Sequence, residues 1–145
     1  MIRRALASDI RDVASLYHAV WHETQAPFMP AQERELRSMP FFMDRMTILL
    51  PTTLVAERNG AVVAFSAWKA RLLGQIFVAA PHRGSGVAAA LLVASETAMA
   101  REGTLQAELH CVVGNDRARR FYKRMGWVRC GRSGWPGSHP FLVYD

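Results

Sequence analysis

The spacing of hydrophobic and polar residues predicts alternating strands and helices in the first part of the chain. The run IRRA at residues 2–5 is typical of a short strand. A helix is predicted from a capping side chain at residue 8 or 9 to about residue 22, because one face carries Ile10, Val13, Leu16, Tyr17 and Val20. Prolines then interrupt the pattern and leave room for one short helix at residues 31–38.

The middle of the chain predicts a hairpin, a further strand and a long helix. Residues 52–70 form two alternating runs joined by Asn59-Gly60, a pair that tolerates the positive φ angles of a tight turn. A third strand follows at residues 72–80 and ends at a proline. The helix predicted at residues 85–102 is apolar almost all round until Ser95, so we expect its first half to be buried.

The last part of the chain alternates again, at residues 105–113. Gln106, Glu108 and His110 are expected on one side of this strand, and the other side holds Leu105, Ala107, Leu109, Cys111 and Val113. Asn115 or Asp116 is expected to cap a helix that ends at Gly126, and two strands follow at residues 127–132 and 140–145. The pattern predicts an α/β (α+β) domain with a mixed sheet of about seven strands.

Composition narrows the class of protein. A chain of 145 residues suggests one domain. No apolar run reaches the ~18 residues that span a bilayer, and the N-terminus lacks the apolar stretch of a secretory signal, so we expect a cytoplasmic protein that does not contact a membrane. Two cysteines without metal-ligand spacing indicate buried thiols and no metal site. The net charge is +6, and the densest basic run, RARRFYKR at residues 117–124, is expected on a solvated helix face.

The segment PHRGSGVAAALL at residues 81–92 carries the clearest chemical signal. A glycine-rich turn that opens a helix is an anion-binding site. A nucleotide P-loop is excluded because the segment lacks Gly-Lys followed by Ser or Thr. Gly84, Gly86 and Ala89 match the dinucleotide fingerprint literally, but the required βαβαβ unit is absent. One alternative interpretation remains open at this point: the glycines only prevent steric clashes in the turn, and no anion binds there.

Two blocks of sequence resemble the GNAT N-acetyltransferase superfamily. In the segment VAAPHRGSGVAAALL, Arg83, Gly86 and Ala88 fit the acyl-CoA-binding motif of that superfamily. A later block, NDRARRFYKRMGW, fits a second motif at Asn115, Ala118, Phe121, Tyr122, Gly126 and Trp127. The resemblance covers the whole chain in element order, and its specific motifs cover about residues 74–127. It implies a single GNAT-type domain at residues 1–145, with helices on both faces of the sheet.

The resemblance also implies how acetyl-CoA is bound. Its pyrophosphate is expected on the turn and on the start of the following helix, formed by Arg83, Gly84, Ser85, Gly86, Val87 and Ala88. Its pantetheine arm is expected along the strand backbone at Phe77 and Val78, where an N–H group stabilises the oxyanion of the tetrahedral intermediate. Asn115 and Ala118 complete the expected cofactor site.

Catalysis requires a base for the amine and an acid for the leaving thiolate. Tyr122 matches the general acid of the family. Many members have a glutamate base five residues before the asparagine; this chain has His110 there, a departure that still supplies a proton acceptor. Glu108 points to the same side of the strand and is the alternative, and water is a third.

The acceptor is expected to be a primary amine, either small with an apolar body or on a protein. Residues that we expect to contact it are Trp21, Glu23, Phe28 and Trp135. The alternative function is a CoA-binding sensor or regulatory domain without catalysis. No nucleic-acid motif accompanies the basic run, so a nucleic-acid partner is not expected. Many members of the family are dimers, which leaves a homodimer open.

Overall fold

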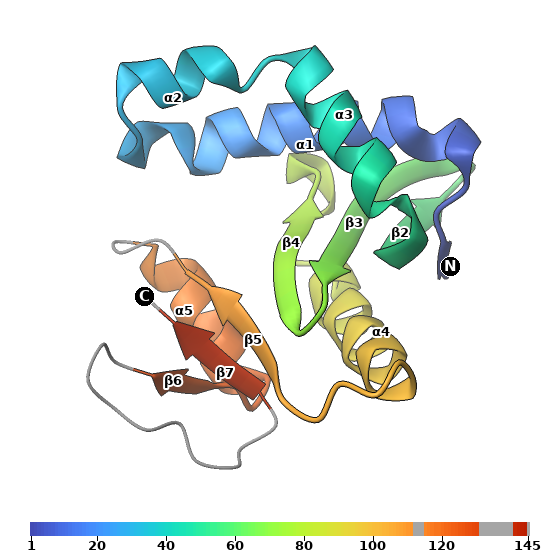
Figure 1. Cartoon of the computed structure of the whole chain (residues 1–145), viewed down its shortest axis with the longest axis vertical. Coiled ribbons are helices and arrows are strands. Elements are labelled where there is room, and N and C mark those ends of the chain that lie inside the picture. The colour runs from blue at the N-terminus through green and yellow to red at the C-terminus, as the bar shows by residue number, and fades with distance from the viewer. Residues whose placement is uncertain (112–114, 131–140, 145) are drawn as a thin grey trace.

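The sheet and its covering helices follow the predicted order. The computed structural model describes residues 1–111, 115–130 and 141–144. Its seven-stranded sheet has the order β1-β2-β3-β4-β5-β7-β6 (Figure 1). The strands are β1 Ile2–Arg4, β2 Thr53–Arg58, β3 Ala61–Lys69, β4 Leu72–Val78, β5 Ala107–His110, β6 Val128–Cys130 and β7 Phe141–Tyr144. The helices are α1 Ile10–Thr24, α2 Ala31–Leu36, α3 Met39–Leu49, α4 Val87–Arg101 and α5 Asp116–Arg124.

The sheet is mixed, as the pattern of hairpins and βα units predicted. Strands β1 to β4 pair antiparallel, and Asn59 and Gly60 join β2 to β3 with φ angles of 53° and 78°. Strands β4, β5, β7 and β6 pair parallel. The α/β fold with a mixed sheet of seven strands is therefore confirmed.

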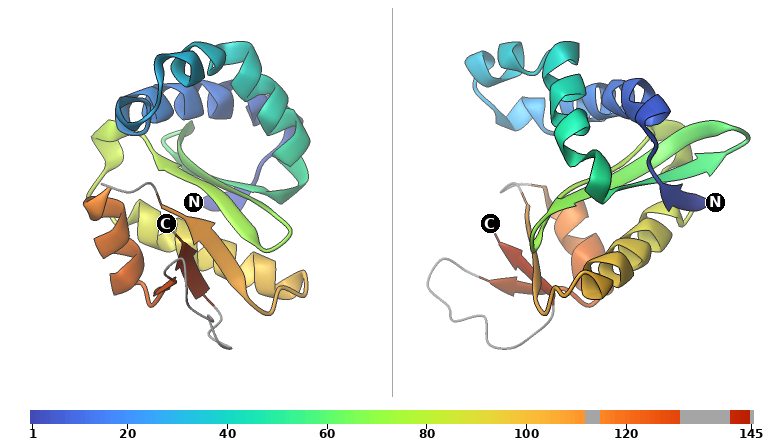
Figure 2. Two further views of the ribbon diagram at one scale, coloured as in Figure 1. Left: turned by 60° about the vertical axis from the view of Figure 1, so that its left-hand side comes forward. Right: turned by 45° about the vertical axis from the view of Figure 1, so that its right-hand side comes forward.

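Helices cover both faces of the sheet (Figure 2). On one face α1 and α3 enclose an aromatic core. In it the centroid of the Tyr17 ring lies 4.4 Å from the ring centroid of Phe42 and 5.3 Å from that of Phe65. On the other face α4 and α5 enclose a second core. There the hydroxyls of Ser66 on β3 and Ser95 on α4 form a buried hydrogen bond of 2.6 Å, which satisfies both polar groups.

Four details of the predicted pattern were wrong. No side chain at residue 8 or 9 caps α1: Asp9 stands at the N-cap position, but its side chain makes no capping hydrogen bond. Helix α3 was missed because Pro40 was read as an interruption, whereas it stands in the first turn, where its missing N–H costs nothing. The first half of α4 is not buried all round, since Val93 remains 50% exposed. Leu105 is 92% exposed because β5 begins only at Ala107.

Strand β4 carries a bulge that changes which face its side chains cover. Ala67 opposes Gln75 and Trp68 opposes Leu73, so Gly74 is an extra residue without a partner on β3. As a result, Leu73, Ile76 and Val78 all pack on the α4 side of the sheet. A bulge bends the strand and increases its local twist. Beyond it β4 leaves its parallel neighbour: Leu72 and Glu108 are the one residue pair that joins β4 to β5 in the described chain.

The turn between β4 and α4 depends on glycines in the left-handed region. Gly84 has φ 75°, and Gly86, the residue that caps α4, has φ 84°. An L-residue at such an angle brings its Cβ close to the backbone carbonyl oxygen. The turn can therefore keep this shape only with glycine or at a cost in backbone strain.

We expect Gly86→Ala to lower the free energy of unfolding by about 1–2 kcal/mol, because alanine is strained at this φ even though a Cβ would meet no atom within 4 Å. The matched control is Gly74→Ala, where a Cβ also meets open space but φ is not positive. This variant is expected to be neutral or stabilising by up to about 0.5–1 kcal/mol. Urea unfolding measures both, and equal losses in the two variants would contradict the role of φ.

The carboxylate of Asp9 links the first strand to the start of the first helix through hydrogen bonds. This carboxylate accepts hydrogen bonds of 2.7 and 3.0 Å from Arg3 and of 2.7 Å from the Leu6 N–H. The bond from Arg3 lowers the pKa of Asp9, although burial opposes the shift. Since the folded-state pKa is depressed, the stabilisation is present above the unfolded-state pKa of about 3.9 and is lost as the pH falls through the folded value.

Asp9→Asn is therefore expected to cost about 1–3 kcal/mol at neutral pH, and this difference should shrink as the solution is acidified. Urea unfolding across the acidic range checks the trend. Asp12→Asn, an exposed change near the start of α1, serves as the control and should change stability by less than about 0.5 kcal/mol. If the loss of stability in Asp9→Asn does not change with pH, this ion pair is not its cause.

Candidate active site

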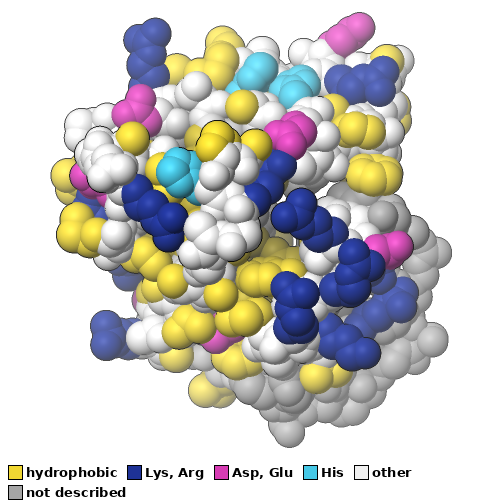
Figure 3. Space-filling view, turned by 180° about the vertical axis from the view of Figure 1, so that it is seen from behind, with side chains coloured by type: hydrophobic (Ala, Val, Ile, Leu, Met, Phe, Trp, Pro, Cys, Tyr) yellow, Lys and Arg dark blue, Asp and Glu magenta, His cyan; other side chains and the backbone are white. Residues whose placement is uncertain are grey.

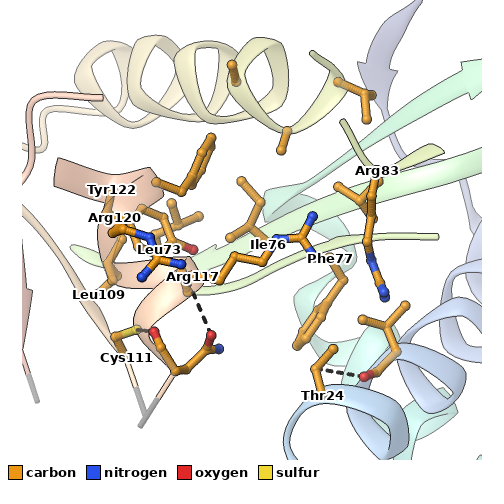
Figure 4. A pocket seen from close by; sticks show the side chains of 18 of the residues that line it. Thr24, Leu73, Ile76, Phe77, Arg83, Leu109, Cys111, Arg117, Arg120 and Tyr122 are labelled. Atoms are coloured by element: carbon orange, nitrogen blue, oxygen red, sulfur yellow. Dashed lines mark hydrogen bonds between the residues drawn. The ribbon is translucent and has the colours of Figure 1, made fainter. Parts of the chain in front are cut away.

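The divergence of β4 and β5 opens a cleft of about 1160 Å³ (Figure 4). Its floor holds Leu73 and Ile76 from β4 and Leu109 and Cys111 from the β5 side. One wall is the end of α1 with the turn before α4, and the opposite wall is α5. Segments far apart in the sequence thus meet around one cavity.

The start of α4 presents to this cleft N–H groups that have no acceptor within the helix. Ala90 donates the first bond within the helix, to the Gly86 carbonyl at 3.1 Å. The N–H groups of Val87, Ala88 and Ala89 therefore have no acceptor within the helix. All three residues line the cleft. Together with the positive end of the helix dipole, these donors favour a bound anion.

Arg83 joins the turn to α1. Its guanidinium binds both carboxylate oxygens of Glu23, the second contact being 3.1 Å, and in Figure 4 the side chain extends from the turn toward α1. The hydrogen bonds from Arg83 lower the pKa of Glu23. Sequence reasoning assigned Arg83 to the cofactor and Glu23 to the acceptor, and the structure brings these two side chains into direct contact.

The α5 wall is organised around its capping residue. The Asn115 side chain accepts a bond of 3.3 Å from the Ala118 N–H, as expected of an N-cap, and the Cys111 thiol donates to the Asn115 carbonyl at 3.8 Å. Tyr122 lies about two turns after Asn115, lines the cleft and is only 8% exposed. Burial raises the pKa of its phenol well above the ordinary value, and Cys111 acts in the same direction. The phenol therefore remains protonated over the physiological pH range.

The two candidate bases occupy different surroundings. His110 is exposed and lines the cleft. Glu108 does not line it; its carboxylate lies 3.6 Å from the Arg71 guanidinium, at the point where β4 and β5 are still paired. His110 thus borders the cleft that Tyr122 also lines, and Glu108 does not.

The other predicted site residues also divide into those that line the cleft and those that do not. All the cofactor-binding candidates line the cleft except Ser85, whose hydroxyl donates to the His82 carbonyl. Among the acceptor-binding candidates, Trp21 is buried in the α1–α3 core and Phe28 is 50% exposed on a 3₁₀ turn away from the cleft lining. Trp135 lies outside the described residues.

Sequence reasoning missed the contribution of the basic run to the cleft. Arg117, Arg120 and Arg124 were expected on a solvated helix face; they are exposed, yet they also line the cavity. The available signal was their spacing of three and four residues, which places them on one side of the helix. The sequence could not show that this side of the helix faces the cleft.

The described residues contain neither a metal-binding cluster nor a membrane-spanning helix. They contain no group of three or more His, Cys, Asp or Glu side chains arranged to hold a metal ion. None of the helices in the described ranges has the length and apolar character needed to cross a bilayer.

Comparison with known proteins agrees with this geometry. The profile of the Acetyltransferase (GNAT) family matches residues 13–127, most of the chain. A search of the curated proteins finds no match.

Solved structures with the same fold include three acetyltransferases at low identity. A PaiA N-acetyltransferase from Thermoplasma acidophilum, in complex with coenzyme A, is 19% identical, with a TM-score of 0.69 over 87% of each chain. The aminoglycoside N-acetyltransferase AAC(6')-Iy in complex with CoA is 16% identical, with a TM-score of 0.74 over 93% of this chain and 91% of that one. A ribosomal-protein-alanine N-acetyltransferase from Brucella melitensis is 18% identical, with a TM-score of 0.70 over 97% and 93%.

The structural likeness extends beyond the matched segment, and the two sequence motifs border one cleft between diverging strands. Both observations agree with the match to the family profile, and on that match the chain belongs to the Acetyltransferase (GNAT) family.

Proposed function

We propose that the protein transfers the acetyl group of acetyl-CoA to a primary amine. The observation that carries this proposal is the cleft itself, which joins an anion-binding helix terminus to a buried, protonated tyrosine. The family and the CoA complexes of two relatives of the same fold support acetyl-CoA as the donor.

The donor fits the cleft in two parts. Its pyrophosphate binds the N–H groups of Val87, Ala88 and Ala89, with Arg83 as a charged donor beside them. Its pantetheine arm lies along β4 beyond Leu73, where that strand has no described neighbour on the β5 side. The arm thereby adds to the sheet as an extra strand does. This arrangement brings the thioester toward Phe77 and Val78, and a backbone N–H there stabilises the oxyanion.

The reaction requires the acceptor to lose a proton before or during attack, because an ammonium has no free electron pair. We assign this step to His110, which lines the cleft, in preference to Glu108, which pairs with Arg71. The amine nitrogen then bonds to the thioester carbon, the tetrahedral intermediate collapses, and the C–S bond breaks with its electron pair on sulfur. The products are an amide and CoA.

Tyr122 stabilises the leaving sulfur. Its raised pKa makes complete proton transfer to a thiolate less favourable than it would be for an ordinary phenol. The same burial strengthens hydrogen bonding, since a thiolate meets few competing waters there. We therefore assign Tyr122 as a hydrogen-bond donor to the departing thiolate, with the proton following as the sulfur is released.

The acceptor is an amine on an apolar small molecule or on a protein. Relatives with the fold include an enzyme for aminoglycosides and one for a ribosomal protein, so the fold supports both classes. The end of α1 with its Glu23 carboxylate borders the donor site through Arg83. A cationic amine approaching from this side meets an acid that is half exposed.

Calorimetry with acetyl-CoA, followed by thiol release across a panel of amines, tests the proposal. We expect micromolar binding and thiol release with at least one amine. NADH is the control ligand and should not bind. Tight binding of acetyl-CoA with no thiol release on any amine would favour the regulatory alternative, and absence of binding would overturn the proposal.

Tyr122→Phe is expected to lower kcat by about 10- to 100-fold while the affinity for CoA changes less than about twofold, because only the leaving sulfur uses the hydroxyl. Tyr17→Phe makes the same chemical change at a buried tyrosine outside the cleft lining, where the hydroxyl accepts a 3.2 Å bond from Gln75. Its kcat should stay near that of the unaltered protein. Equal losses of kcat in both variants, or a loss of CoA affinity in Tyr122→Phe, would assign Tyr122 a structural role.

A further inference from the structure

Three arginines of α5 form a cationic row along one wall of the cleft. Arg117, Arg120 and Arg124 follow one another at spacings of three and four residues and therefore project from the same side of the helix. All three line the cleft, and Figure 4 shows the first two beside its floor. Figure 3 shows basic side chains gathered around a hollow with hydrophobic atoms at its base.

The charge of this row is not balanced within the described chain. None of the three arginines has an ion pair or hydrogen bond to a described residue, and no Asp or Glu stands among the described residues that line the cleft. Arg83 differs from them, because it forms an ion pair with Glu23. Among the described residues, the row is thus the main group of positive side chains in the cavity that has no ion pair.

A row of this kind selects an anion and repels the acceptor. Guanidinium groups bind phosphate oxygens with paired, charge-assisted hydrogen bonds, whereas a protonated amine near three arginines is disfavoured. The row therefore faces the donor. The pyrophosphate of the donor already matches the N–H groups at the start of α4, on another wall. The donor has one further anionic group, the 3′-phosphate of its ribose, which as a monoester carries about −1.5 to −2 charges at neutral pH.

We infer that Arg117, Arg120 and Arg124 bind the 3′-phosphate of coenzyme A and make the protein prefer CoA to dephospho-CoA. This inference rests on the proposed function, since it concerns a second part of the same donor. The protein thereby recognises its donor at two separate anionic points, one by backbone N–H groups and one by side chains.

The test compares the affinities of CoA and dephospho-CoA, which differ only in this phosphate. Calorimetry is carried out with the unaltered protein, with the double variant R117A/R120A and with Lys123→Ala. Lys123 is the control because it is an exposed cation of the same helix that does not line the cleft. R117K/R120K, which keeps the charge but not the planar fork, is a further variant.

We expect the unaltered protein to bind CoA at least about tenfold more tightly than dephospho-CoA, the size of one or two charge-assisted bonds. R117A/R120A should lose about tenfold in CoA affinity and less than about twofold in dephospho-CoA affinity. Lys123→Ala should alter neither, and R117K/R120K should recover part of the preference. Because the altered arginines are exposed, the variants are expected to remain folded.

Two results would overturn the inference while leaving the proposed function intact. One is equal affinity of the unaltered protein for CoA and dephospho-CoA. The other is an equal loss of both affinities in R117A/R120A, which would place the row at another part of the nucleotide. Failure of the unaltered protein to bind either compound would overturn the proposed function as well.

Discussion

The separation of β4 from β5 is the constraint on which the rest of the structure depends. Two parallel strands that are paired at Leu72 and Glu108 diverge beyond the bulge at Gly74. A sheet that opens in this way would lose its continuity if nothing bridged the gap. Helix contacts on the α4 face provide the bridge: the Trp127 indole, just after α5, donates a 2.8 Å bond to Glu96 of α4. Burial raises the pKa of that glutamate, and the bond from Trp127 partly offsets the shift.

Strand β4 is therefore held by the packing on both faces and still bounds the cleft with its free edge. The two cores on either face hold β4 through Leu73 and Phe77, so the exposed edge of the strand contributes little to packing and is left for a ligand. The chemical groups then come from the ends of elements: the start of α4, the cap of α5 and the end of α1. Ends of helices carry unpaired backbone groups, and those groups are rigid because the helices behind them are packed.

Much of the fold, and the turn and cap that border the cleft, could be predicted from the sequence. Alternation and the Asn59-Gly60 turn located the hairpin, because register and turn chemistry are local properties. The glycine-rich turn and the cap at Asn115 were recognised for the same reason. Helix α3 was missed because a proline is permissive or disruptive according to its place in the first turn, which the sequence alone left ambiguous.

The contacts around the end of α1 and the orientation of α5 could not be predicted in the same way. Whether Trp21 faces a ligand or a core depends on where α3 packs, which is a long-range contact. The direction of the arginine row likewise depends on how α5 is rotated against the sheet, a property that helical spacing does not determine. Glu23 and Arg83 are 60 positions apart, and nothing in either segment signals their contact.

The open edge of β4 has a consequence for the behaviour of the protein in concentrated solution. An unpaired strand edge is a template for another chain, and many sheet proteins protect such edges with charges or bulges to avoid aggregation. Here the edge is recessed inside a cavity, follows a bulge, and is bordered by arginines of like charge. A second copy of the protein brings arginines of the same charge to this edge and is repelled, whereas a single anionic chain is attracted. The geometry that admits a ligand thus also protects the protein from self-association through this edge.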